Sequence, residues 1–126
     1  MNKPRYQYLG GSEISGVLNI SNWESPLSIW HRKRFGGEKE VTDAMYFGTQ
    51  LEIFVKNEFK KRNKNLKVLS KKQMRDEGLE SIEHEEFPFI AGKPDGYFVD
   101  EKGQMGILEI KTCNEFAKDE WAKGIP

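Results

Sequence analysis

The spacing of apolar and polar residues predicts helices in the first half of the chain and strands in the second. Residues 43–62 carry apolar side chains at three- and four-residue steps, which is typical of a long helix with one buried face. Thr42 or Asp43 would cap that helix. Short apolar runs bounded by turn residues then predict four strands, at residues 66–69, 87–91, 97–99 and 106–111.

Shorter helices are expected at both ends of this pattern. Residues 10–19 read as a glycine turn that enters a helix capped by Ser12, and residues 115–123 read as a final helix. Ser25 followed by Pro26 is a stronger helix start, and the glycine pair 36–37 would end that helix. The elements indicate one α/β or α+β domain, in which helices pack on a mixed four-stranded sheet.

Composition narrows the class of protein. Lys and Arg together number 20, as do Asp and Glu, so the net charge is zero. A protein that only coats DNA is usually basic, but carboxylates clustered in one place can cancel basic residues elsewhere in the chain. The zero net charge therefore does not exclude a nucleic-acid partner, and we expect positive and negative side chains to lie on separate parts of the surface. Cys113 is the only cysteine, which fits a reducing cytoplasm, and no apolar stretch approaches the length of a membrane span. We expect a cytoplasmic protein without a secretory signal or membrane segment.

Glu109 and Lys111 carry the first candidate chemistry. Alternate residues of a strand share a face, so these two side chains should project together from the run 106–111. A carboxylate and an ammonium on a half-buried strand are costly unless they are paired or used. The alternative is an exposed ion pair on an edge strand, because so short a motif often occurs by chance.

Two further carboxylates lie where they could join this pair. Asp95 stands at a bend, in Lys93-Pro94-Asp95-Gly96, from which a hairpin can bring it near Glu109; ordinary turn chemistry is the alternative. Glu52 falls on the apolar stripe of the long helix, where a buried carboxylate needs a cation or a hydrogen-bonding partner. Alternatively, Glu52 lies at the border of the stripe and pairs with Lys56.

Three carboxylates and a lysine would form a site of hard oxygen ligands, which Mg²⁺ prefers and Mn²⁺ can also occupy. Bound cations could polarise a scissile phosphate and activate water. The lysine could orient or deprotonate that water and offset negative charge in the transition state. The pattern therefore indicates metal-dependent hydrolysis of a phosphodiester.

Asp95 followed by Glu109-Ile110-Lys111 resembles the PD-(D/E)xK nuclease signature, with Pro94 in place. Four segments in order, 10–14, 23–27, 44–52 and 107–112, resemble the YqaJ-like viral recombinase family, which is related to lambda exonuclease. This resemblance covers nearly the whole chain and implies a restriction-endonuclease-like core.

The resemblance also implies roles for individual residues. Asp95 and Glu109 would bind metal, together with the backbone carbonyl of Ile110. Glu52 would hold a second metal or its waters, and Lys111 would position the attacking water.

The implied reaction is exonucleolytic degradation of one strand from a duplex DNA end, for phage or prophage recombination. Ser12 and Arg5 fall where family members contact the 5′ phosphate, although Arg5 could instead be a solvated arginine. Such enzymes work with a single-strand annealing protein, and members similar to lambda exonuclease form rings, so we expect a homo-oligomer.

Family domains continue past the position of Pro126 with a glutamine-bearing helix and a further strand. We therefore expect residues 1–126 to form a single nuclease domain without that segment, which self-associates, binds a completing chain or has weak activity. The alternatives are a non-catalytic remnant that binds DNA ends or a partner, and a PD-(D/E)xK endonuclease.

Overall fold

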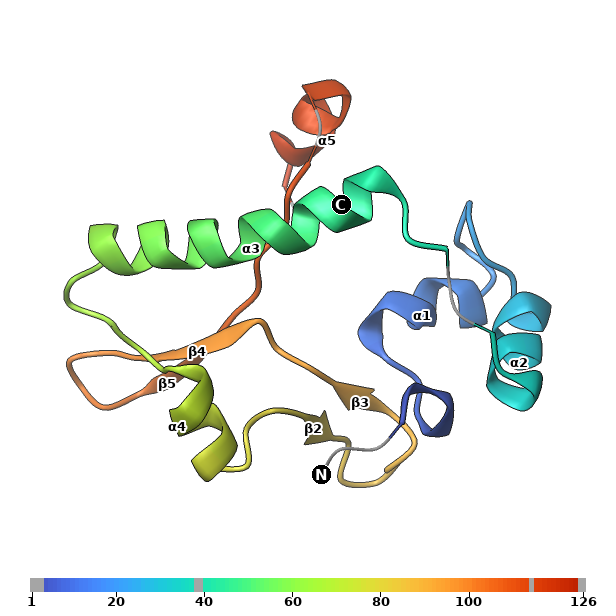
Figure 1. Ribbon diagram of the computed structural model, residues 1–126, viewed down its shortest axis with the longest axis horizontal. Coiled ribbons are helices and arrows are strands. Elements are labelled where there is room, and N and C mark those ends of the chain that lie inside the picture. Colours follow the sequence, from blue (N-terminus) through green and yellow to red (C-terminus); the bar gives the residue numbers. More distant parts are fainter. Residues whose placement is uncertain (1–3, 38–39, 114, 125–126) are drawn as a thin grey trace.

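The computed structural model describes residues 4–37, 40–113 and 115–124 and has an α+β architecture. Figure 1 shows the long helix α3 (Asp43–Arg62) running along a small sheet, with α1 (Gly11–Val17) and α2 (Pro26–Phe35) gathered beyond its N-terminal end. A 3₁₀ helix, η1 (Arg5–Gln7), precedes α1. The predicted α+β class is confirmed. None of the helices in the described part of the chain is long and apolar enough to cross a bilayer.

Side-chain caps define where α2 and α3 begin. The Ser25 hydroxyl accepts a hydrogen bond from the Ser28 N–H at 3.2 Å, and Pro26 is the first residue of α2, as predicted. Thr42 rather than Asp43 caps α3. The prediction that Ser12 caps α1 is wrong, because α1 begins at Gly11, with Gly10 at the N-cap position two residues before Ser12.

The strands form two antiparallel sheets. Strands β1 (Lys67–Val68), β4 (Gly96–Val99) and β5 (Met105–Leu108) lie in the order β1-β4-β5. Strands β2 (Ile82–Glu83) and β3 (Ala91–Gly92) form a separate pair. The single mixed four-stranded sheet is therefore wrong.

The predicted strand at 87–91 is mostly a turn. The His84 Nδ1 atom accepts hydrogen bonds from the N–H groups of Glu86 and Phe87, and the Ile90 N–H donates to the Phe87 carbonyl at 2.8 Å. These local hydrogen bonds bend the chain before it enters β3, so only the last residue of the predicted strand belongs to a strand.

A short helix, α4 (Lys71–Asp76), follows β1 in a stretch where the sequence pattern predicted neither helix nor strand. The Ser70 hydroxyl accepts from the Gln73 N–H at 3.2 Å, and the Gln73 side chain accepts from the Ser70 N–H at 3.0 Å. This capping box is visible in the sequence as a serine followed three residues later by a glutamine. The predicted final helix consists of η2 (Glu115–Ala117) and α5 (Lys118–Trp121).

The buried core is small and lies between the three-stranded sheet and α4. It contains Leu69, Met74 and Tyr97, against which Leu79 and Val99 pack. No residue of α3 is fully buried, although its predicted apolar stripe is present. Large apolar side chains of this helix remain exposed: Met45, Tyr46, Phe47, Leu51, Ile53, Phe54 and Val55. The stripe is therefore only partly covered.

Candidate functional site

A backbone bridge brings the N-terminal segment beside the strand that leads to Asp95. Leu9 pairs with Ile90 in parallel orientation, next to β3. The Leu9 N–H donates to the Phe89 carbonyl at 2.6 Å, and the Ala91 N–H donates to the Leu9 carbonyl at 3.0 Å. The residues that follow Leu9 and those that follow β3 therefore lie close together.

One open cavity of about 530 Å³ joins these segments to the end of β5. Five of the predicted site residues line it: Arg5, Ser12, Asp95, Glu109 and Lys111. The predicted phosphate-binding pair and the carboxylate–lysine group thus share a single cavity, although they are far apart in the sequence. Glu52 lies in an adjoining cavity, which is also lined by Asp95.

Asp95 is held from two directions. Its Oδ2 atom accepts a hydrogen bond from the Ile110 N–H at 2.7 Å, and its backbone carbonyl accepts one from the Lys56 ammonium at 2.9 Å. Lys56 crosses directly over Gly96, where an added Cβ would lie 2.8 Å from the ammonium nitrogen. The glycine that follows Asp95 therefore allows α3 to reach this turn.

Strand β5 ends at Leu108, earlier than the predicted residue 111. The strand stops there because the Ile110 N–H donates a hydrogen bond to the Asp95 side chain instead of continuing the strand ladder. The Lys111 ammonium donates to the Glu109 carboxylate, so these two side chains do share a side, as predicted.

The pair taken alone also fits the alternative of an exposed ion pair on an edge strand. The side chains of Lys111 and Glu109 are 59% and 52% exposed, and β5 is an edge strand. The surroundings of Lys111 differ from those of an isolated ion pair, because three carboxylates act on the Lys111 ammonium. The hydrogen bond that Lys111 donates to Glu109 raises the pKa of Lys111, partial burial opposes this, and the charges of Glu109, Asp95 and Glu52 raise the pKa further.

Glu52 is half-buried on the side of α3 that passes the end of β5. At Gly48, one turn earlier, an added Cβ would lie 3.4 Å from the Thr112 hydroxyl oxygen. The structure shows no Glu52–Lys56 ion pair within its described ranges, because the Lys56 ammonium is directed to the Asp95 carbonyl. The alternative pairing of Glu52 is therefore not formed.

The donor chemistry of the cavity fits a divalent cation. The carboxylates of Asp95 and Glu109 and the carbonyl of Ile110 are hard oxygen ligands. Among the described residues, however, no three His, Cys, Asp or Glu side chains are placed to hold a metal ion together. The Glu109 carboxylate accepts a hydrogen bond from the Lys111 ammonium, so binding of a metal cation by Glu109 would compete with that contact.

Arg5 is tied into the structure on several sides. Its guanidinium donates to the Ser12 hydroxyl at 2.7 Å and lies 3.7 Å from the Glu13 carboxylate. The Lys33 ammonium donates to the carbonyls of Arg5 and Tyr8 at 2.7 and 2.6 Å and to Glu13 at 2.9 Å. Arg5 is thus more constrained than the freely solvated arginine of the alternative interpretation.

Glu13 is a residue that the sequence did not single out. It is 2% exposed and accepts hydrogen bonds from the Gly10 N–H, Arg32 and Lys33. Burial raises the pKa of Glu13, but these hydrogen bonds and the charge of Arg5 outweigh it, so the pKa lies below its usual value. Glu13 therefore fastens α1 to α2 beneath the cavity wall that carries Ser12.

Comparison with known proteins supports the resemblance seen in the sequence. Residues 2–126 match the family profile of the YqaJ-like viral recombinase domain. A relative from Bacillus subtilis (strain 168), the "Uncharacterized protein YqaJ", is 32% identical over 119 residues. The match covers 93% of this chain and 34% of the relative, so the chain spans about a third of that protein's length. The chain therefore belongs to the YqaJ-like viral recombinase family.

Proposed function

We propose that this chain is a metal-dependent DNA exonuclease that hydrolyses phosphodiester bonds from duplex ends. One observation carries the proposal: Arg5 and Ser12 line the same cavity as Asp95, Glu109 and Lys111. A group that recognises a terminal phosphate, placed beside a hydrolytic group, is the arrangement that cleavage from an end requires.

Arg5 and Ser12 would bind the 5′ phosphate. A guanidinium presents several N–H donors in a fixed plane, which suits phosphate oxygens, and the Ser12 hydroxyl can donate a further hydrogen bond. The Lys33 contacts hold the backbone of Arg5, so little ordering is needed when DNA binds. Binding there would bring the adjacent phosphodiester towards Asp95 and Glu109.

Asp95, Glu109 and the Ile110 carbonyl would hold Mg²⁺ or Mn²⁺, and Glu52 would hold a second ion or its waters. The ion, when bound, would activate water and offset charge on the phosphate. The hydrogen bonds from Ile110 and Lys56 would keep Asp95 oriented for this task, as outer contacts do at metal sites. Lys111 would leave Glu109 and use its ammonium to position the attacking water.

A second candidate is a DNA-end-binding module without turnover. It is favoured by the lack, within the described ranges, of three side chains already placed to hold a metal. A structure-specific or restriction-type PD-(D/E)xK endonuclease is the third alternative, since carboxylates and a lysine alone do not require a DNA end. An annealing-protein partner and a homo-oligomer remain proposals that follow from the family.

The test uses linear duplex DNA labelled at the 3′ ends and carrying either 5′ phosphates or 5′ hydroxyls, beside a closed circular duplex. With Mg²⁺ we expect shortening of the labelled strands, faster from 5′ phosphates, no cleavage of the circle, and no reaction in EDTA. End binding without shortening would support the non-catalytic module. Cleavage of the circle would support the endonuclease.

A further inference from the structure

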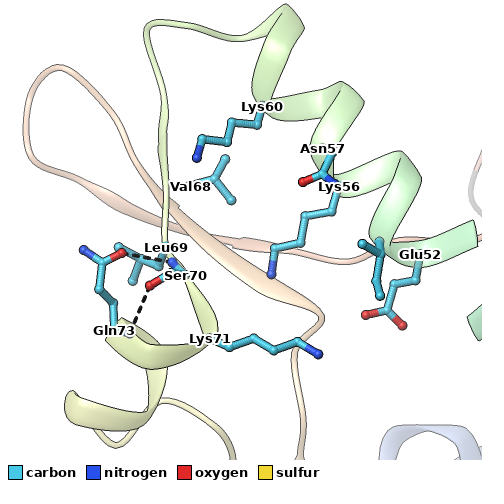
Figure 2. A pocket seen from close by; sticks show the side chains of 10 residues that line it. Glu52, Lys56, Asn57, Lys60, Val68, Leu69, Ser70, Lys71 and Gln73 are labelled. Atoms are coloured by element: carbon cyan, nitrogen blue, oxygen red, sulfur yellow. Dashed lines mark hydrogen bonds between the residues drawn. The ribbon is translucent and has the colours of Figure 1, made fainter. Parts of the chain in front are cut away.

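A lysine-lined groove continues from the candidate site along α3. Figure 2 shows this groove, of about 330 Å³, between α3 and the segment that leads from β1 into α4. Lys56 and Lys60 reach into it from α3, Lys71 stands on the α4 side, and Glu52 lies at one end. We call it the lysine groove.

Three cavities are joined in a row. The lysine groove shares Glu52 and Lys71 with a middle cavity. The middle cavity shares Lys93, Pro94 and Asp95 with the candidate site. No residue lines both the lysine groove and the candidate site, so the middle cavity, which Asp95 lines, stands between the groove and the cavity of Arg5 and Ser12.

The charges along the groove are incompletely neutralised. Lys60 and Lys71 form no ion pair within the part of the chain that the structure describes, and Glu52 is the one acidic residue lining the groove. In the middle cavity, Glu80 lies 3.6 Å from Arg75. Two free ammonium groups therefore flank a path that ends at the carboxylates of the candidate site.

The apolar residues that line the groove are Ile53, Val68 and Leu69. A free phosphate would need only the ammonium groups. A polynucleotide can place its phosphates on the lysines and its sugars and bases against an apolar surface. The bases are accessible for that contact only when the strand is unpaired, so the groove fits a single strand better than a duplex.

The direction of the strand follows from the proposed function, on which this inference rests. With the 5′ phosphate at Arg5 and Ser12 and the scissile bond at Asp95, the same strand continues on the far side of Asp95. We propose that the lysine groove binds the backbone phosphates of a single DNA strand on the 3′ side of the scissile bond, through Lys60 and Lys71.

The test compares two double variants of the full chain. K60Q/K71Q removes the two free charges, while Lys56 is left unchanged because it holds Asp95. K64Q/K102Q removes the same charge from exposed positions outside the groove, in the loop after α3 and in the β4–β5 turn. The probes are single-stranded oligonucleotides with a 5′ phosphate or hydroxyl, from the dinucleotide to the octanucleotide, titrated in EDTA over a range of salt. Melting curves verify that both variants fold.

For the unchanged chain and the control we expect affinity to rise with oligonucleotide length. For K60Q/K71Q the gain from the longer oligonucleotides should disappear. The slope of its plot of log affinity against log salt concentration should be less negative by about 1.4, because each of the two lost phosphate contacts contributes roughly 0.7. Its preference for a 5′ phosphate should be unchanged.

Two outcomes would overturn the inference in different ways. If K60Q/K71Q matches the control while the unchanged chain prefers 5′ phosphates and cleaves with Mg²⁺, the groove assignment fails and the proposed function stands. If the unchanged chain binds none of the oligonucleotides and cleaves no DNA, the proposed function fails, and the groove assignment with it.

Discussion

The Asp95 carboxylate accepts a hydrogen bond of 2.7 Å from the backbone N–H of Ile110, across the end of the β4–β5 hairpin. A hydrogen bond to a charged group contributes about 1.5–3 kcal/mol, so this contact can compete with continuation of the strand. It places Glu109 and Lys111, the neighbours of Ile110, around Asp95. This relationship is the basis for treating the four residues as one site.

Metal binding should be visible without any DNA. Carboxylates that share a cavity gain a partner when a cation binds, so Mg²⁺ or Mn²⁺ should raise the melting temperature of the chain. At a hundredfold excess over the dissociation constant the stabilisation is about 2.7 kcal/mol. Asp95→Asn keeps an acceptor for the Ile110 N–H but loses the charge, so its melt should not respond. An unchanged melt of the unsubstituted chain in millimolar Mg²⁺ and Mn²⁺ would count against the site.

Lys111→Ala should separate cation binding from turnover. The substitution frees Glu109 from its ammonium partner, so the cation-dependent rise in melting temperature should persist. Cleavage should slow by about 10²–10³-fold, as when a group that stabilises transition-state charge is removed. Lys102→Ala, in the exposed β4–β5 turn, is the matched control. If the Lys111 variant cleaves at the control's rate, the role given to this lysine is wrong.

Gly96→Ala should disturb Asp95 indirectly. The new Cβ would meet the flexible end of Lys56, so the fold should survive, but the hydrogen bond from Lys56 to the Asp95 carbonyl should be lost. We expect a loss of about 1 kcal/mol of stability. Metal affinity should fall by roughly tenfold or more, as for other outer contacts of metal sites.

A double-mutant cycle checks the cause. If Gly96→Ala acts by displacing Lys56, then in a Lys56→Met background it should add little to the loss of metal affinity. Gly92→Ala is the control for adding a methyl group, because a Cβ there meets no atom within 4 Å. Additive effects of Gly96→Ala and Lys56→Met would show that the two residues act independently.

Glu13→Gln should destabilise the α1–α2 unit and alter its response to acid. The substitution removes the negative charge that compensates the side chains of Arg32 and Lys33. Breaking a buried ion pair in this way should lower the free energy of unfolding by roughly 3 kcal/mol. Because the folded-state pKa of Glu13 lies below its unfolded value, its stabilisation is complete above that unfolded value, about 4.3. The stabilisation is lost as the pH falls through the lowered pKa.

Urea unfolding at several pH values between neutral and strongly acidic measures this effect. The stability difference between the unsubstituted chain and Glu13→Gln should be constant at neutral pH and shrink in acid. Glu58→Gln is the control, because Glu58 pairs with Arg62 on the exposed surface of α3 and should matter little. A difference between the Glu13 variant and the unsubstituted chain that does not change with pH would contradict the role of the charge.

The sequence predicted the features that depend on near neighbours. The period of α3, the Ser25-Pro26 start and the hairpin after Asp95 all follow from residues a few positions apart. The hairpin also made the approach of Asp95 to the 109–111 segment foreseeable, and the motif order led to the family. The capping box at Ser70 was equally local, so α4 could have been predicted.

What the sequence could not supply depends on distant pairing. The bridge between Leu9 and Ile90, which brings Arg5 and Ser12 to Asp95, joins segments with no mutual pattern. The cationic partners of Glu13, Arg32 and Lys33, lie 19 and 20 residues further along the chain, so no pattern in the neighbouring sequence predicts that Glu13 is buried. Lys56 likewise has Glu52 as its obvious helical neighbour, but only the tertiary fold directs it to Asp95.

The central claim is that Asp95 and its neighbours form a hydrolytic site that Arg5 and Ser12 supply with a DNA end. The most direct test is the rate at which the unsubstituted chain and Asp95→Asn shorten a 5′-phosphorylated, 3′-labelled duplex in Mg²⁺, with DNA binding measured in parallel. We expect both proteins to bind the end and only the unsubstituted chain to shorten it, with Asp95→Asn slower by at least about 10²-fold. Equal rates for the two proteins, or end binding without shortening by the unsubstituted chain, would contradict the account.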